Sequence, residues 1–189
     1  MSPGDTRPTA QVWLHGPRVT LRPWTDDDLA PFAALNADAE VMRHFPAMLD
    51  RGQSDALAGR VRERMAEQGW GLWALQTPEL AFAGFVGLAR VPFELPLPGF
   101  DGPQLEIGWR LARPAWGLGY AGEGAMLALD FAQRVLRQER VVSFTAWSNQ
   151  RSAAVMRRIG LQPAGEFDHP RLAGHALQRH LLYTTPSAD

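Results

Sequence analysis

Two residue types are missing from this 189-residue sequence, cysteine and lysine. The absence of cysteine excludes disulfides, thiolate metal sites and a thiol nucleophile. Because all 19 basic residues are arginine, Schiff-base chemistry and the phosphate-binding lysine of a P-loop are excluded as well. Covalent catalysis through a cysteine or lysine side chain is therefore excluded.

Long apolar runs and a dominant charge are lacking too. The longest apolar stretches, Leu80–Val86 and Val141–Trp147, are too short to cross a bilayer, and no basic segment followed by an apolar core opens the chain. The net charge of −1 gives no broad basic field for nucleic acid. We therefore expect a cytoplasmic protein whose partners are neither membranes nor nucleic acids.

The composition, 46% hydrophobic and 21% charged, is typical of one globular domain. We expect residues 1–9, rich in Pro, Ser and Thr, to form a flexible tail and residues 10–189 to form a single domain. Strands that precede a late β-α-β-α-β run predict an α/β fold with a mixed sheet flanked by helices. Residue periodicity and capping signals predict these elements: a strand Val19–Pro23, a helix from the Thr25 cap to about Ala39, a helix Asp55–Glu67 capped by Ser54, strands Gly69–Gln76, Ala81–Val91 and Gln104–Leu111, a helix to about Gln138, a strand Val141–Trp147, a helix Gln150–Ile159, and strands Gly165–Asp168 and Ala176–Thr184.

A glycine-rich turn links the strand that ends at Leu111 to the following helix. A turn of this kind leaves several backbone N–H groups unpaired and aimed in one direction, and the helix dipole strengthens their pull on an anion. The turn therefore predicts a phosphate or pyrophosphate site. Its residues are Trp116, Gly117, Leu118, Gly119, Tyr120, Ala121 and Gly122.

The spacing Gly117-x-Gly119-x-x-Gly122 also fits the dinucleotide fingerprint of a Rossmann domain. That motif requires an acidic residue at the end of the next strand to bind a ribose. Here the next strand ends in Trp147-Ser148-Asn149, and too little sequence follows the turn for the remaining β-α-β units. The sequence therefore disfavours a dinucleotide-binding domain.

A different family matches more positions. The segment from Glu106 to Leu161 resembles the GCN5-related N-acetyltransferase superfamily, in which the amides of a comparable turn hold the pyrophosphate of acetyl-CoA. Trp-Gly-x-Gly-Tyr-Ala with Glu123 nearby, followed by Asn149-x-x-Ser152, is similar to the branch that acetylates the N-termini of ribosomal proteins. The opening, with Arg18 and Leu21-Arg22-Pro23, is similar as well. The resemblance covers about Arg18 to Tyr183.

The resemblance implies a mostly antiparallel sheet with a central pair of parallel strands, Leu105–Leu111 and Val141–Trp147, that splay at their C-terminal ends. The freed backbone groups would bind the pantetheine arm as another strand does. Leu111 and Ala112 would make these contacts, residues 116–122 would hold the diphosphate, and the Asn149 side chain would reach the pantetheine. A plain helix cap is the alternative role for Asn149.

Glu106 is the candidate general base, acting on the amine through water, because it is the one acid in the strand Gln104–Leu111. Burial would raise the pKa of its carboxyl group toward neutrality. The alternatives are that Glu106 orients the substrate or pairs with Arg110. A protein α-amine, with a pKa of about 7.7–8.0, makes a smaller demand on such a base than lysine at about 10.4.

Many members of the superfamily protonate the leaving thiolate with a tyrosine, but Met156 stands at the corresponding position. Ser152 is the candidate substitute, with a helix-cap or packing role as the alternative. For the acceptor pocket, the candidates are His44 with Phe45 in a loop, and Trp73 and Trp109 on strands, where core packing is the first explanation for tryptophan. We expect no metal site.

The sequence thus predicts an acetyl-CoA-dependent N-acetyltransferase that moves the acetyl group directly to a primary amine, with a protein N-terminus as one acceptor. Two alternatives stay open. One is acetylation of a small amine, such as an antibiotic or amino acid, for which the apolar loop Pro92–Pro103 could close the pocket or form a homodimer contact. The other is an acyl-CoA sensor without catalysis, which would not need Glu106.

Overall fold

The computed structural model describes residues 10–97 and 104–186. The tail expected at residues 1–9 and the second half of the loop Pro92–Pro103 lie outside the described residues. Within these described ranges, no helix is both long and apolar enough to span a membrane.

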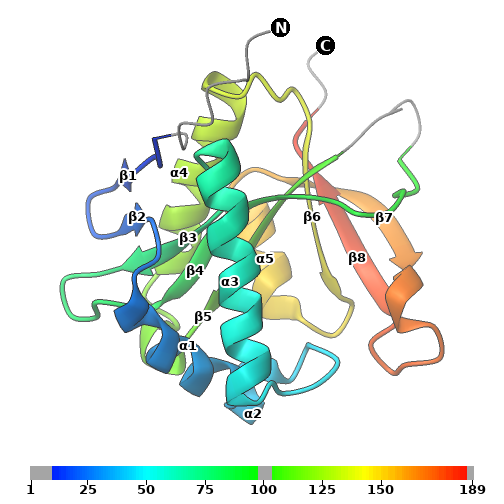
Figure 1. Ribbon diagram of the computed structural model, residues 1–189. Helices are drawn as coiled ribbons and strands as arrows, with labels where there is room; N and C mark the ends of the chain where they lie inside the picture. Colours follow the sequence, from blue (N-terminus) through cyan, green and yellow to red (C-terminus); the bar gives the residue numbers. More distant parts are fainter. Residues whose placement is uncertain (1–9, 98–103, 187–189) are drawn as a thin grey trace, which may run out of the picture.

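An eight-stranded mixed sheet forms the centre of the molecule, with strand order β1-β2-β3-β4-β5-β6-β8-β7 (Figure 1). Every neighbouring pair is antiparallel except β5 and β6, which run parallel. This arrangement confirms the predicted fold class. The strands are β1 Leu14–His15, β2 Thr20–Arg22, β3 Leu72–Gln76, β4 Gly84–Arg90, β5 Leu105–Leu111, β6 Val141–Ala146, β7 Gln162–Asp168 and β8 Arg179–Thr184.

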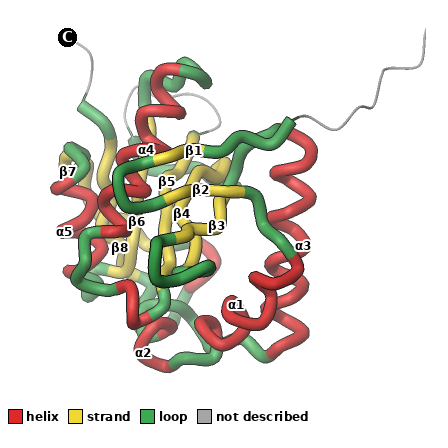
Figure 2. Tube along the Cα trace, turned by 90° about the vertical axis from the view of Figure 1, so that its left-hand side faces the viewer, coloured by secondary structure: helices red, strands yellow, loops and turns green. Residues whose placement is uncertain are grey.

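Helices cover both faces of the sheet, as the edge-on view in Figure 2 shows. The helices of the N-terminal half lie on one face and α4 with α5 on the other, so the sheet separates two helical layers. Because the short 3-10 turns fall in the connections, only the five α-helices form these layers. They are α1 Leu29–Asn36, α2 Ala39–Met42, α3 Arg51–Gln68, α4 Tyr120–Arg134 and α5 Gln150–Arg158.

The N-terminal helices differ from the sequence prediction. The helix expected from Thr25 to about Ala39 begins as a 3-10 turn and continues as α1, which ends at Asn36. The separate helix α2 begins at Ala39, because the Asp38 side chain caps it by accepting from the Glu40 and Val41 amides. The second helix begins at Arg51, where the Asp50 carboxylate accepts from the Gln53 amide and Gln53 bonds back. The prediction that Ser54 caps this helix is therefore wrong: Ser54 is buried and accepts a hydrogen bond of 2.9 Å from the Asn36 side chain.

An ion pair closes the N-terminal end of the sheet. Both terminal nitrogens of Arg22 on β2 donate to the Asp28 carboxylate at 2.8 Å, and the Thr25 amide donates to the same group at 2.8 Å. Arg22 and Asp28 are both buried, so each charge depends on the other for solvation. The pair ties the strand to the turn that starts α1.

We predict that Asp28→Asn destabilises the fold by about 3–5 kcal/mol, because it leaves the Arg22 guanidinium buried without a counter-charge. The measurement is the free energy of unfolding in urea at neutral pH. Asp27→Asn is the matched control, since Asp27 is exposed, and it should change the free energy by less than about 0.5 kcal/mol. Equal losses for the two variants would contradict the prediction.

Candidate active site

The parallel pairing of β5 and β6 is short. Leu105 pairs with Val141 and Glu106 with Val142, and beyond these residues neither strand has a partner in the other. The buried Ser143 hydroxyl donates to the Ile107 carbonyl at 2.8 Å, which is the last link across the gap. The two strands therefore open toward their C-terminal ends.

Backbone groups along β5 alternate between the two neighbouring strands. Ile107 directs its carbonyl toward β6, so the N–H groups of Trp109 and Leu111 face the opening as well. The Leu111 carbonyl accepts a hydrogen bond of 2.8 Å from the Trp116 indole. Ala112 differs from the prediction, because its amide donates to the Ala83 carbonyl and its own carbonyl accepts from the Ala115 amide, both at 2.9 Å.

The glycine turn carries a run of unpaired amides at the N-terminus of α4. Gly117 and Gly119 have φ angles of 75° and 84°, a left-handed conformation that turns successive N–H groups the same way. No described residue accepts a hydrogen bond from the amides of residues 117–122. The Trp116 amide, by contrast, donates to the Arg113 carbonyl. The turn thus offers main-chain donors and the helix dipole to an anion.

Side chains fix this turn from outside. The Glu123 carboxylate accepts hydrogen bonds from the Arg18 and Val19 amides and from the Arg18 guanidinium, so the acid in the first turn of α4 is occupied. Arg18 also donates to the Leu118 carbonyl at 2.9 Å and lies over the Tyr120 ring. Tyr120 and Leu118 therefore contribute backbone to the turn, while the Tyr120 ring packs inward.

The second predicted signature lies where β6 meets α5. The Asn149 side chain caps α5, accepting from the Ser152 amide at 3.3 Å and donating to the hydroxyls of Thr145 and Ser152. Both sides of the Asn149 amide group are thus engaged, which supports the helix-cap alternative. The Ser152 hydroxyl accepts this bond and keeps its own proton available, whereas Met156 is fully buried.

Glu106 lies on the face of the sheet covered by α1 and α3. Desolvation raises the pKa of its carboxyl group to about 8. No hydrogen bond or ion pair reaches this carboxylate within the described residues, and Arg110 does not pair with it. A half-buried acid that titrates near neutrality beside an open backbone gap can accept a proton from an amine.

A cavity of about 490 Å³ lies next to Arg110 on the same face of the sheet. Phe45 lines it, and the Arg110 guanidinium stacks on the Phe45 ring at 3.9 Å. His44 lies beside this cavity and approaches the Ser148 hydroxyl at 3.3 Å, and burial, followed by Arg43 and Arg151, lowers its pKa. The structure thus brings the loop after α2 close to the end of β6. Sequence reasoning missed Arg110 as part of this site. Because residues two and four apart in a strand lie on one face, its spacing from Glu106 could have indicated that both side chains lie on the same face of β5.

The two tryptophans proposed for the acceptor pocket lie elsewhere. Trp73 is fully buried, donates to the Val12 carbonyl at 2.8 Å and packs edge-on against Phe131 of α4. The prediction that Trp73 lines the pocket is therefore wrong. Trp109 pairs with Val86, whose side chain faces α4, so the Trp109 ring lies on the opposite face from Glu106.

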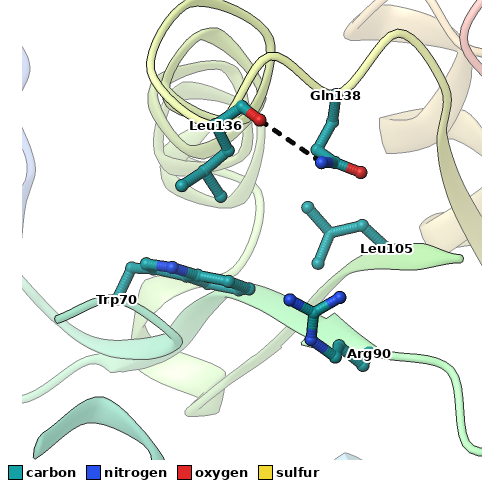
Figure 3. Close-up of a pocket in the computed structure, with 5 residues that line it drawn as sticks. All are labelled: Trp70, Arg90, Leu105, Leu136 and Gln138. Atoms are coloured by element: carbon teal, nitrogen blue, oxygen red, sulfur yellow. Dashed lines mark hydrogen bonds between the residues drawn. The ribbon is translucent and has the colours of Figure 1, made fainter. Parts of the chain in front are cut away.

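A smaller cavity of about 160 Å³ lies at the other end of the sheet (Figure 3). The Arg90 guanidinium lies beside the Trp70 ring there, and Gln138 donates to the Leu136 carbonyl above them. Leu105 forms one wall, and because it precedes Glu106 in the strand it faces the α4 side. This cavity is separate from the candidate active site.

Histidines gather near the edge of the sheet without forming a metal site. His169 and His180 have ring centroids 4.9 Å apart inside a cluster with Phe93, Phe144 and Phe167. Across residues 10–97 and 104–186, no three His, Asp or Glu side chains lie together as metal ligands would. Burial is the first cause that lowers the pKa of both histidines, as expected for packed rings.

A forked parallel pair beside a helix N-terminus that presents unpaired amides defines an acyl-CoA-dependent transferase of the acetyltransferase fold. Residues 18–162 match the GNAT acetyltransferase domain, and the chain belongs to that family. Within it, the chain is 27% identical over 154 residues to the uncharacterized protein YkkB of Bacillus subtilis, covering 80% of this chain and 86% of YkkB. It is 30% identical over 155 residues to the FsC-acetyl coenzyme A-N(2)-transacetylase of Aspergillus fumigatus, covering 80% of this chain and 66% of that protein.

Solved structures share the fold at lower identity. The acetyltransferase from Agrobacterium tumefaciens superposes with a TM-score of 0.74 at 23% identity, covering 98% of this chain and 100% of the other. RimL, a ribosomal L7/L12 alpha-N-protein acetyltransferase solved with coenzyme A, gives a TM-score of 0.72 at 14% identity, covering 93% and 98% of the two chains. These likenesses establish the fold.

The glycine turn yields a prediction about charge. Gly117 has a left-handed φ and open space around it, and both Asn and Asp tolerate this conformation. Gly117→Asp should therefore bind coenzyme A about tenfold more weakly than Gly117→Asn, because a carboxylate beside the amides repels a diphosphate. Titration calorimetry with coenzyme A compares the isosteric pair. Equal affinities would show that no anion binds at this turn.

Proposed function

We propose that the protein is an acetyl-CoA-dependent N-acetyltransferase that transfers the acetyl group directly to a primary amine. The observation that carries this proposal is the run of unpaired amides from Gly117 to Gly122 beside the opening between β5 and β6. Acetyl-CoA supplies an activated acyl thioester when bound. Structural neighbours solved with coenzyme A or acetyl-CoA support the choice of donor.

The backbone holds the donor in this proposal. The amides of residues 117–122 take the diphosphate, and the Trp109 and Leu111 amides pair with the pantetheine arm as a strand would. An amide of β5 near Leu111 also faces the acyl carbonyl oxygen and stabilises the negative charge that develops there. Asn149 serves as the cap that orients α5, and its contribution to the pantetheine is through that geometry.

Glu106 is the general base on the acceptor side. Its carboxylate takes a proton from the incoming ammonium, directly or through water, so that the neutral amine can attack the thioester carbonyl. Ser152 donates a proton to the departing sulfur, since its hydroxyl hydrogen is not committed to Asn149, and the proton that the attacking nitrogen loses as the amide forms restores the hydroxyl. No covalent intermediate on the enzyme is needed.

The acceptor is a primary amine, with a protein N-terminus and a small molecule as the two classes. RimL is named as a protein N-terminal acetyltransferase, and the fungal relative as a transacetylase of FsC. The cavity of about 490 Å³ beside Arg110, lined partly by Phe45, offers room for the acceptor group. A sensor without catalysis is disfavoured because Glu106 is retained as an unpaired acid at the site.

We predict that kcat/KM rises with pH until it levels off above about pH 8, because Glu106 accepts a proton only when ionised and its pKa is raised to about 8. Glu106→Gln should lower kcat/KM by roughly 10²-fold or more at neutral pH. It should leave the affinity for coenzyme A unchanged. The measurement is release of free coenzyme A with a panel of N-terminal peptides and small amines between pH 6 and 9.

Glu63→Gln serves as the control, since Glu63 is exposed on α3 away from the opening, and it should behave as the wild type. A Glu106→Gln enzyme with the rate and pH profile of the wild type would remove Glu106 from the mechanism. Tight binding of acetyl-CoA without turnover on any amine would instead favour the sensor.

A further inference from the structure

Arg110 is a cation without a counter-charge. One terminal nitrogen of its guanidinium donates to the Asn36 carbonyl oxygen, and no carboxylate in the described chain pairs with it. Its Nε is buried with no hydrogen-bond partner, and Nη2 has none among the described residues either. Burying a guanidinium with unsatisfied donors is costly, and burial indeed lowers its pKa to about 10. A group that pairs with these donors would offset that cost.

The guanidinium is also held rigidly. Asn36 is fully buried and donates to the Ser54 hydroxyl at 2.9 Å, so the acceptor of Arg110 is itself fixed by α3. The flat faces of the guanidinium stack on Phe45 at 3.9 Å and on Phe85 at 5.5 Å. The donors without a described partner, Nε and Nη2, form the edge of the guanidinium that matches a carboxylate in geometry.

The cavity next to Arg110 has the matching electrostatics. The cavity has a volume of about 490 Å³. Its lining includes two arginines, Arg110 and the exposed Arg60, and no acidic residue of the described chain. The remaining lining is apolar apart from Gln53. A cavity with this lining attracts an anion and offers apolar surface to the group that carries it.

Arg110 and Glu106 share one face of β5, with Gly108 between them. Their backbones are about 13 Å apart, since a strand rises about 3.3 Å per residue. The Glu106 carboxyl group and the Arg110 guanidinium, neither with a charged partner among the described residues, therefore flank an open strand segment. A ligand with an ammonium at one end and an anion at the other would satisfy both.

We propose that the acceptor carries a carboxylate in addition to its primary amine, and that Arg110 binds this carboxylate while the amine faces Glu106. The acceptor is thus a zwitterion of about the length of a short peptide, and Arg110 determines specificity for it. This inference rests on the proposed acetyltransferase function and names the chemistry of its acceptor. The carboxylate has two sources, a free C-terminus or an acidic side chain close to an N-terminal amine.

The test uses matched acceptors in the assay for release of coenzyme A. Leu-Ala is compared with Leu-Ala amide for a free carboxylate, and Leu-Asp amide with Leu-Asn amide for an acidic side chain. We expect at least about a tenfold preference in kcat/KM for the charged member of one pair. The pair that shows it identifies the source. No preference in either pair, with turnover of the neutral amines, overturns this inference and leaves the acetyltransferase function standing.

Variants connect the preference to Arg110. Arg110→Gln should reduce the charged-to-neutral ratio of kcat/KM to about one, and Arg110→Lys should restore part of it. Arg64→Gln, an exposed arginine of α3 outside the cavity, should keep the full ratio. A ratio unchanged in Arg110→Gln overturns the assignment of the carboxylate to Arg110.

A binding measurement separates recognition from catalysis. The products N-acetyl-Leu-Ala and N-acetyl-Leu-Asp amide are titrated against the protein loaded with coenzyme A, each beside its neutral counterpart. Tighter binding of a charged product, lost in Arg110→Gln, supports the carboxylate site even if every turnover assay fails, in which case the proposed function alone falls. Equal binding within both pairs overturns the inference.

Discussion

The early end of the pairing between β5 and β6 is the constraint on which this molecule's chemistry depends. Inside a sheet, backbone N–H and C=O groups normally find partners, and leaving them unpaired costs free energy. Here Ser143 makes the last bond across the gap, and the strands beyond it stay apart. The fold keeps unpaired main-chain donors at its centre, and a ligand that behaves like a strand can use them.

The same strand presents two charges that nothing in the described chain neutralises. Glu106 has a raised pKa from desolvation, and Arg110 keeps unsatisfied donors while packed between aromatic rings. The two could have formed an ion pair with each other, but Asn36 draws Arg110 toward α1. Keeping Glu106 and Arg110 apart lowers the stability of the fold, and it leaves each side chain available to a ligand.

Much of this could be predicted from the sequence, and what could not has physical reasons. The glycine turn and the strand before it are local patterns that could be read from the sequence, and the parallel pair of β5 and β6 followed from the family resemblance. The role of Ser54 was wrong because Asp50 and Gln53 form a capping box one turn earlier, and the side chain of Ser54 is used by Asn36 from another helix. Trp73 was misplaced because a strand residue can face either layer, and only the packing against Phe131 decides which. The environment of Arg110 joins four separate segments and has no local signal.

Strand alternation explains how one element can serve two substrates independently. Odd-numbered residues of β5 turn their backbone groups toward the opening, so in the proposed function Trp109 and Leu111 would meet the donor through main-chain atoms that mutation does not remove. Even-numbered residues turn their side chains toward the acceptor face, where Glu106 and Arg110 lie. In the proposed function, donor recognition would therefore be insensitive to sequence, whereas acceptor recognition would change with single substitutions. Solved neighbours at 14–23% identity share the fold, and the fold alone does not specify an acceptor.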